Sequence, residues 1–234
     1  MQQPTEIPAN PGQVILIDKP LRWTSFDVVK KLKYVLKAKK IGHAGTLDPL
    51  ATGLLILCTE KKTKEIDRYQ AQEKEYTGTL VLGKTTPSVD LETEVNAEFP
   101  IGHITESMIY EAARQLTGEI TQVPPIFSAI KIGGQRAYQK ARQGQTEADV
   151  VIKSRAVTVS EFEITDISLP QVSFRVVCSK GTYIRSLVRD FGLLLQSGAY
   201  MSALCRTRIG DFRLGDALGV EEFVHLHKRD VGVV

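Results

Sequence analysis

The hydrophobic and polar positions of the chain alternate between strand-like runs and helix-like periods. Apolar or alternating runs predict strands at 13–18, 54–59, 76–82, 126–132, 150–167, 172–178 and 201–209. Apolar residues spaced three or four apart predict a helix at 26–36. Further helices are expected at 106–116, 136–142, 182–195 and 220–227. This succession favours an α+β (mixed α/β) fold with a mixed, largely antiparallel central sheet flanked by helices.

Cap residues set the ends of two of these helices. Thr24 or Ser25 can cap the first helix, and Thr105 can cap the second, which Gly118 stops. The first helix is expected to turn its apolar positions toward the core: Phe26, Val29, Leu32, Val35 and Leu36.

No repeat, linker or composition shift divides the 234 residues. We expect a flexible N-terminal arm at residues 1–12, which is polar and proline-containing, and one domain at residues 13–234. Residues 124–152 resemble an insertion, because proline, paired glycines and basic residues interrupt the strand pattern there.

The composition excludes several classes of protein. A content of 42% hydrophobic and 24% charged residues is that of a globular protein. The longest strictly apolar stretch, residues 54–58, is too short to span a bilayer, and the N-terminus does not resemble a signal peptide. Three widely separated cysteines, Cys58, Cys178 and Cys205, indicate a reducing compartment. We therefore expect a cytoplasmic protein with no membrane segment.

The formal net charge is only +3, but the basic residues are clustered. Residues 19–40 hold eight basic side chains and one acid, and residues 131–155 hold six basic side chains and two acids. Such a segregation fits a polyanionic partner, whose phosphates release counterions on binding. Charge alone fits an ordinary solvated helix face equally well.

The candidate chemistry centres on a glycine-punctuated loop, residues 42–53, just before an apolar strand. Within it Asp48 is the only carboxylate and His43 the only imidazole. Loops held by rigid strands commonly present reactive groups. The plain alternative is an Asx-turn at Asp48 and an ordinary loop histidine.

A second candidate segment is residues 179–190. Tyr183 and Arg185 lie two apart at a strand-to-helix junction, so in an extended backbone they would point the same way. An arginine beside a carboxylate keeps it ionised and oriented. Alternatively Tyr183 packs in the core and Arg185 faces solvent. Tyr76, in KEYTGTL, is a further candidate, or simply an aromatic residue on a sheet.

Motifs for other mechanisms are missing from the sequence. It contains no glycine-rich nucleotide fingerprint and no GxSxG elbow. His225 and His227 are two apart on a predicted helix, so they would not share a face for a metal. We expect neither a metal nor a cofactor.

Six blocks of the sequence together resemble the TruB family of bacterial tRNA pseudouridine synthases. They occur in family order between residue 13 and about residue 215: VILIDKP, GHAGTLDPLATGLL, KEYTGTL, PPIFSAIKIGGQRAYQKARQG, CSKGTYIRSLVRD and LCRTRIGDF. The resemblance implies the pseudouridine synthase fold, with residues 124–152 as a thumb-like insertion. It also implies isomerisation of uridine to pseudouridine at position 55, in the T-loop of tRNA.

The resemblance assigns catalytic roles to three residues. Asp48 resembles the catalytic aspartate, whether it adds to C6 of the base or acts at C1′ of the sugar. Arg185 resembles the arginine that ion-pairs with that aspartate. Tyr76 resembles the tyrosine stacked on the extruded base.

The resemblance assigns four further residues to substrate binding. Tyr183 and Leu204 resemble residues packed around the uracil, and His43 resembles the side chain that enters the space left by the flipped base. Lys19, in the family's Lys-Pro motif, would support the floor of the site.

The implied partner is the T-arm stem-loop of tRNA, bound by a monomer without an obligate protein partner. The basic residues 30–40 and the insertion would then clamp the RNA. Two features depart from the family. Cys205 stands where arginine is common, so Arg206 or Arg208 would have to compensate. The chain also ends at Val234, which leaves no room for the C-terminal PUA module of many members.

Two other functions compete with the enzyme. One is a non-catalytic tRNA-binding module or RNA chaperone on the same fold. The other, a guide-RNA-dependent relative, is less favoured because such relatives depend on the C-terminal module. Asp48, Tyr76 and Arg185 together favour the enzyme, since a pure binder has no need for a carboxylate beside phosphates.

Overall fold

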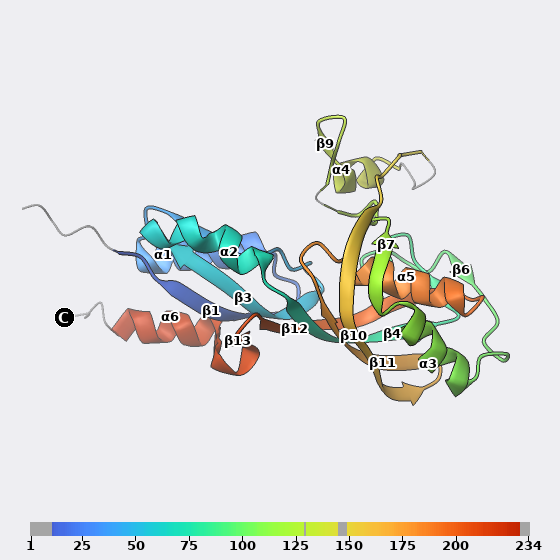
Figure 1. Cartoon of the computed structure of the whole chain (residues 1–234). Helices are drawn as coiled ribbons and strands as arrows, with labels where there is room; N and C mark the ends of the chain where they lie inside the picture. Colours follow the sequence, from blue (N-terminus) through green and yellow to red (C-terminus); the bar gives the residue numbers. More distant parts are fainter. Residues whose placement is uncertain (1–10, 129, 145–148, 230–234) are drawn as a thin grey trace, which may run out of the picture. The chain divides into compact units, whose positions relative to one another are not determined.

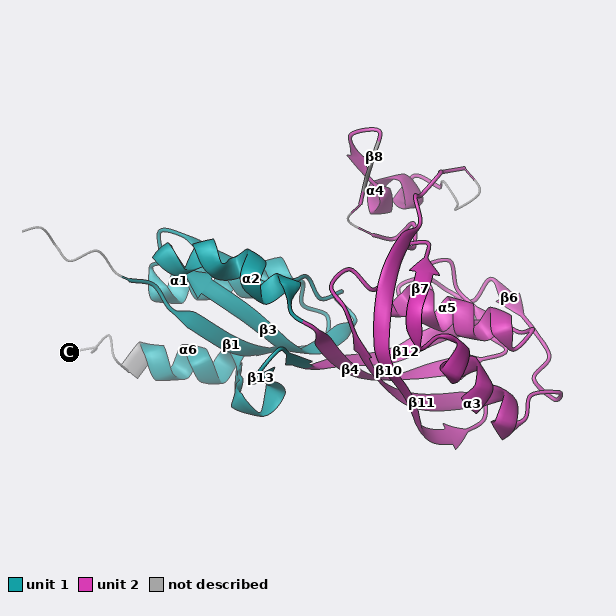
Figure 2. Cartoon of the chain, viewed as in Figure 1, with its two compact units in different colours: residues 1–72, 208–234 teal, residues 73–207 magenta. Residues whose placement is uncertain are grey.

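The structure, a computed structural model, describes residues 11–128, 130–144 and 149–229 (Figure 1). The chain forms two compact units: unit 1 comprises Met1–Gln72 and Arg208–Val234, and unit 2 comprises Glu73–Thr207 (Figure 2). Most of the expected N-terminal arm lies outside the described residues. That residues 13–234 act as one domain stays a prediction.

The sheet of unit 1 is built around one strand that is buried on both faces. Strand order is β14-β1-β3, with β2 also on β3. The β1–β3 and β2–β3 pairs are antiparallel, whereas β1 and β14 are parallel. The strand bounds are β1 Val14–Lys19, β2 Ile41–His43, β3 Ala51–Thr59, β13 Phe212–Arg213 and β14 Leu218–Gly219.

Helices cover both faces of this sheet. Leu55 and Leu57 of β3 pack with α1 and α6, while Leu54, Ile56 and Cys58 pack toward α2. This explains why residues 54–58 are continuously apolar rather than alternating. The helices of unit 1 are α1 Ser25–Leu36, η1 Glu60–Glu65, α2 Ile66–Ala71, η2 Leu214–Asp216 and α6 Val220–Arg229.

The main sheet of unit 2 has the order β12-β4-β11-β10-β7, and its β4–β11, β11–β10 and β10–β7 pairs are antiparallel. Its strands are β4 Lys74–Leu82, β7 Gly118–Gln122, β10 Arg155–Ser168, β11 Gln171–Cys178 and β12 Ala199–Ile209, whose last two residues belong to unit 1. Short hairpins pair β5 (Lys84–Thr85) with β6 (Ala97–Glu98), and β8 (Lys131–Ile132) with β9 (Gln135–Arg136).

An aromatic core joins this sheet to its helices. The ring centroid of Phe162 lies 5.7 Å from those of Phe174 in β11 and Phe191 in α5 (Ile184–Leu194). Helix α3 (Glu106–Gln115) packs against β10 and α5. The insertion carries the β8–β9 hairpin and α4 (Ala137–Arg142); its residues 129 and 145–148 lie outside the described part.

The expected fold class is confirmed: a mixed, mostly antiparallel sheet flanked by helices. Several local predictions were wrong. Phe26 is 68% exposed, because α1 turns Ser25, Val28, Val29 and Leu32 inward instead. The predictions also missed η1, α2 and β7, as well as η2 and several strands of two or three residues.

The prediction of a strand at 126–132 was also wrong for the first part of that range. Among its described residues only Lys131–Ile132 is a strand. The carbonyl of Phe127 accepts from the Arg185 guanidinium, and the carbonyl of Ser128 accepts from the backbone N–H of Tyr138. These carbonyls therefore serve tertiary contacts rather than a strand ladder. The next strand begins at Arg155 rather than at Val150.

None of the helices in the described ranges combines the length and the apolar content needed to cross a membrane.

Gly78 provides a test of the packing in unit 2. A Cβ there would lie 2.6 Å from Cζ of Phe174 and 2.8 Å from the carbonyl oxygen of Ala203. We expect Gly78→Ala to lower the free energy of unfolding by about 1–3 kcal/mol, because β4 must move to make room. Gly102→Ala is the control, since its Cβ would meet nothing within 4 Å. Equal urea midpoints for the two variants would contradict this account.

Candidate active site

Asp48 lies in the loop between β2 and β3 of unit 1. It is half-buried, and its carbonyl accepts a bond from the backbone N–H of Ala51 at 3.1 Å, which closes a tight turn over Pro49. The preceding residue, Leu47, is 3% exposed and exchanges two bonds with the Ser25 hydroxyl at the start of α1. The backbone around Asp48 is therefore held on both sides.

Lys19, at the end of β1, is fully buried beside this loop. Its ammonium donates to the carbonyls of Trp23 at 2.6 Å, Pro20 at 3.0 Å and Pro49 at 3.5 Å. The Pro49 carbonyl also accepts from the backbone N–H of Arg22 at 2.7 Å. Lys19 thus ties the entry of α1 to the residue that follows Asp48.

His43 is the last residue of β2, where it pairs with Leu57 of β3. Its side chain is half-buried. Unit 1 therefore holds three of the predicted site residues on a single support, the strand pair β1–β3 with its attached β2: Lys19, His43 and Asp48.

Tyr76 lies on β4 in unit 2 and is 9% exposed. It stands opposite Val176 of β11, which itself stands opposite Phe162 of β10. Directly opposed residues of antiparallel strands share a face, so Tyr76 projects on the same face of the sheet as the aromatic core.

Leu204 and Cys205 of β12 face opposite ways. The Thr207 hydroxyl donates to the Glu75 carboxylate at 2.7 Å, so both lie on the face away from Tyr76. Alternation along β12 then puts Leu204 and Arg206, 8% and 1% exposed, on the Tyr76 face, and Cys205 on the other face.

Arg206 thus shares the face of Leu204, whereas Cys205 does not. Whether Arg206 compensates for the cysteine stays a prediction.

Tyr183 and Arg185 do not share an extended backbone, so that expectation was wrong. Tyr183 is the N-cap of α5, with φ −100° and ψ 112°, whereas Arg185 already belongs to the first helical turn. The Gln122 side chain holds the backbone of Tyr183 by two bonds, and the Arg155 guanidinium carbon lies 5.2 Å from the Tyr183 ring centroid.

Arg185 is 5% exposed, so the alternative that it faces solvent was also wrong. Its guanidinium donates to the carbonyls of Phe127 at 2.7 Å and Ser88 at 3.1 Å. Its Nε lies 3.7 Å from a carboxylate oxygen of Asp90, which is 3% exposed. A buried arginine in such a setting is fixed in direction.

Asp90 is a functional candidate that the sequence analysis missed. It is the first acid of the acidic residues at 90–98, a stretch that contains none of the motif blocks. The preceding residue, Val89, has φ +61°, which is unfavourable for a β-branched side chain and costs on the order of 1–3 kcal/mol. Contacts of Thr86 and Met201 to this turn hold it in place. Strained residues of this kind cluster at functional sites, which makes the neighbouring Asp90 a candidate.

Lys74 and Cys178 face each other across β4 and β11, on the Tyr76 face. Burial, reinforced by the nearby Arg206 cation, lowers the pKa of Lys74 to about 8. Burial raises the pKa of the Cys178 thiol to about 11, so this cysteine is not a nucleophile at neutral pH.

The predicted site residues are divided between the two units. Lys19, His43 and Asp48 belong to unit 1; Tyr76, Tyr183, Arg185 and Leu204 belong to unit 2. The expected ion pair between Asp48 and Arg185 stays a prediction. Among the described residues no cluster of three or more His, Cys, Asp or Glu side chains could hold a metal ion.

Comparison with solved structures identifies the class of fold. A chain in the crystal structure of a Cbf5-Nop10-Gar1 complex superposes with a TM-score of 0.72 at 31% identity. The superposition covers 99% of this chain and 60% of that chain. The fold is that of the pseudouridine synthases.

Sequence comparison identifies the family. The model of the TruB family pseudouridylate synthase (N terminal domain) matches residues 33–184. The tRNA pseudouridine synthase B of Flavobacterium johnsoniae is 57% identical over 91% of this chain and 94% of that protein. The enzyme of the same name from Phocaeicola vulgatus is 52% identical over 91% and 92%, respectively. The chain belongs to the TruB family of pseudouridylate synthases.

The brace at Lys19 can be tested by Lys19→Met, which keeps the length of the side chain but removes its donors. We expect the free energy of unfolding to fall by about 1–3 kcal/mol, because buried carbonyls lose a partner. Exposed Lys61→Met is the control and should stay within about 0.5 kcal/mol of wild type. Urea unfolding measures both, and a Lys19→Met value inside the control range would refute the brace.

The lowered pKa of Lys74 predicts a pH dependence of stability. Between about pH 8 and pH 10.5 the unfolded chain binds a proton at Lys74 that the folded chain does not, so stability from this group rises with pH. The free energy of unfolding of wild type minus that of Lys74→Met should therefore rise by on the order of 2 kcal/mol across this range. Urea unfolding at pH 7.5 and pH 10 tests it, and a difference that is independent of pH would show the shift to be absent.

Proposed function

We propose that this protein converts uridine into pseudouridine at position 55 of tRNA, in the T-loop. The observation that carries the proposal is the 57% identity with a tRNA pseudouridine synthase B along 94% of that protein. In this reaction the N1–C1′ bond breaks, the uracil turns over and a C5–C1′ bond forms. The hydrogen on C5 leaves as a proton and N1 gains one, so atoms and electrons balance without a co-reactant.

Asp48 is the residue that initiates this chemistry. Its carboxylate acts either at C6 of the uracil or at C1′ of the ribose. Support comes from the fixed backbone around it, through Ser25, Leu47 and the Lys19 brace. A reactive group that is already positioned needs little reorganisation in the transition state.

Arg185 ion-pairs with the Asp48 carboxylate and orients it. The guanidinium is suited to this role because two backbone carbonyls and Asp90 fix its plane. Asp90 is a positioning residue, which acts through Arg185. An arginine is always charged in proteins, so it can hold and orient a carboxylate at any working pH.

The uracil must leave the stack to reach Asp48, which costs a few kcal/mol. Tyr76 stacks on the extruded base, and Tyr183 and Leu204 pack around it. The nearly buried positions of Tyr76 and Leu204 on one face of the sheet suit an apolar base pocket. His43 fills the space that the base leaves in the loop, and stacking there recovers part of the cost.

The RNA is bound by basic surfaces through its shape and phosphates. These surfaces are α1 with the residues up to Lys40, and the insertion at 124–152, whose helix α4 carries Lys140 and Arg142. We therefore propose the T-arm stem-loop as a sufficient substrate. We further propose a cytoplasmic monomer without an obligate protein partner; its three free cysteines fit a reducing compartment.

Tritium release tests the assignment. Wild type should release tritium from a T-arm stem-loop that carries 5-tritiated uridine, and Asp48→Asn should be at least about 100-fold slower, because it lacks the reactive carboxylate. Asp211→Asn, an exposed aspartate of the same unit, is the matched control and should keep wild-type activity.

The same variants separate the enzyme from a non-catalytic tRNA binder. An enzyme variant that has lost only its chemistry still binds RNA, so Asp48→Asn should keep a Kd near that of wild type. Release by Asp48→Asn at the wild-type rate, or no release by wild type while it binds the stem-loop tightly, would refute the proposed function.

A further inference from the structure

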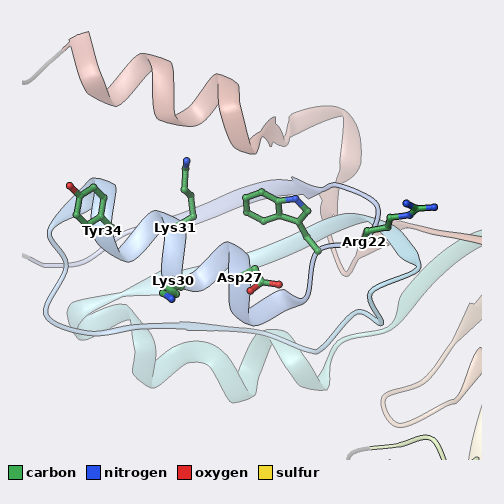
Figure 3. Close-up of a pocket in the computed structure, with 6 residues that line it drawn as sticks. Arg22, Asp27, Lys30, Lys31 and Tyr34 are labelled. Carbon is green, nitrogen blue, oxygen red and sulfur yellow. The ribbon is translucent and has the colours of Figure 1, made fainter. Parts of the chain in front are cut away.

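A groove in unit 1 is not part of the site described above. It follows α1 and has a volume of about 530 Å³, within the range of small-ligand sites. Figure 3 shows Asp27, Lys30, Lys31 and Tyr34 along α1, and Arg22 on the segment before the helix. We call it the α1 groove; its lining residues are Arg22, Trp23, Asp27, Lys30, Lys31 and Tyr34.

The α1 groove has an excess of positive charge. It contains three cations against the single carboxylate of Asp27. That carboxylate accepts from the backbone N–H of Thr24 at 2.9 Å and from its hydroxyl at 2.6 Å, as part of the N-terminal cap of α1, and these bonds lower the pKa of Asp27. Lys31 lies 3.9 Å from the exposed Glu221, a distance and exposure at which ion pairs are weak. Arg22 and Lys30 remain suited to bind an anion.

Aromatic side chains accompany these cations. Tyr34 is 85% exposed, and Phe26, on the same helix, is 68% exposed. Trp23 packs partly against the core of unit 1 and also lines the groove. Aromatic rings beside basic residues are the usual means of binding unpaired nucleotides, because the rings stack on bases while the cations contact phosphates.

The α1 groove is connected to the loop of Asp48 through the backbone. The Trp23 carbonyl accepts from Lys19, and the backbone N–H of Arg22 donates to the Pro49 carbonyl at 2.7 Å. Pro49 directly follows Asp48. An RNA strand held in the groove is therefore held against the same rigid support as the reactive carboxylate.

We propose that the α1 groove binds an unpaired nucleotide of the substrate RNA other than the uridine that reacts. Its base stacks on Tyr34 and its phosphate lies at Lys30. These two residues are one helical turn apart, so their Cβ atoms are separated by about 5–6 Å. Arg22 and Trp23 hold the adjoining nucleotide at the other end. This inference rests on the proposed function, because it takes the substrate to be tRNA.

The single tryptophan of the chain makes the groove directly observable. Asp48→Asn protein, which does not consume the substrate, is titrated with an unmodified tRNA transcript while the fluorescence of Trp23 is followed. We expect a saturable change in fluorescence. Adding Tyr34→Ala should raise Kd by about 5- to 150-fold, the range for loss of one stacked base. Adding Lys30→Gln should reduce the slope of log Kd against log salt by about 0.7.

Matched controls are Tyr110→Ala, an exposed tyrosine of α3, and Lys61→Gln, an exposed lysine of η1; both should leave Kd unchanged. Wild-type tritium release with no change in Trp23 fluorescence, or with an unaltered Kd for Tyr34→Ala, overturns the α1 groove but not the proposed function.

Two other outcomes separate the remaining possibilities. RNA binding that changes Trp23 fluorescence without tritium release by wild type overturns the proposed function and leaves the groove standing. A fluorescence change that follows protein concentration alone, together with dimers in sedimentation, makes the groove a surface between two copies and overturns the proposal.

Discussion

The loop of Asp48 depends on the hydrogen bonds that the fully buried ammonium group of Lys19 donates to backbone carbonyls. Transfer of a charged amine out of water is costly unless polar groups replace its hydration. Here the carbonyls of Pro20, Trp23 and Pro49 do so, and all three belong to backbone outside regular helix and strand. One cation thus satisfies carbonyl groups that a helix or sheet ladder would otherwise satisfy.

The same solution occurs in unit 2. The guanidinium of Arg185 is buried and has only hydrogen-bond donors, so each donor needs an oxygen atom as its acceptor. It finds the carbonyls of Ser88 and Phe127 and the carboxylate of Asp90, and it thereby fixes two irregular segments against α5. In both units a buried cation organises loops that lack a regular hydrogen-bonding pattern. A charge used in this way holds irregular backbone in place.

Elements with strong local signals were predictable from sequence. Strand β1 and helices α3, α5 and α6 follow periods that their own residues set, and Thr24 and Thr105 cap α1 and α3 as expected. Elements that depend on residues distant in the sequence were not predictable in this way. The segment at Ile126 has apolar residues like a strand, but its carbonyls bind Arg185 and Tyr138 instead. Strand β7 carries few apolar residues and exists because β10 pairs with it.

The candidate site was predictable only in part, for the same reason. The motif blocks identify Asp48, Tyr76 and Arg185 by resemblance, but nothing local reveals the support around them. Asp90 lies outside the motif blocks, and only the fold places it beside Arg185. Tyr183 and Arg185 looked equivalent at two residues apart, yet the helix begins between them and gives each a different environment.

Helix α1 shows where an explanation based on folding alone stops. Its inner face packs Val28, Val29 and Leu32, and its cap is complete, so the helix needs no further apolar residue for stability. Tyr34 and Phe26 are nevertheless largely exposed among lysines. An exposed aromatic ring contributes little to folding, because folding does not remove it from water. Its presence beside cations, on the helix whose entry Lys19 ties to Asp48, is explained by binding a ring that arrives from outside: a base of the RNA.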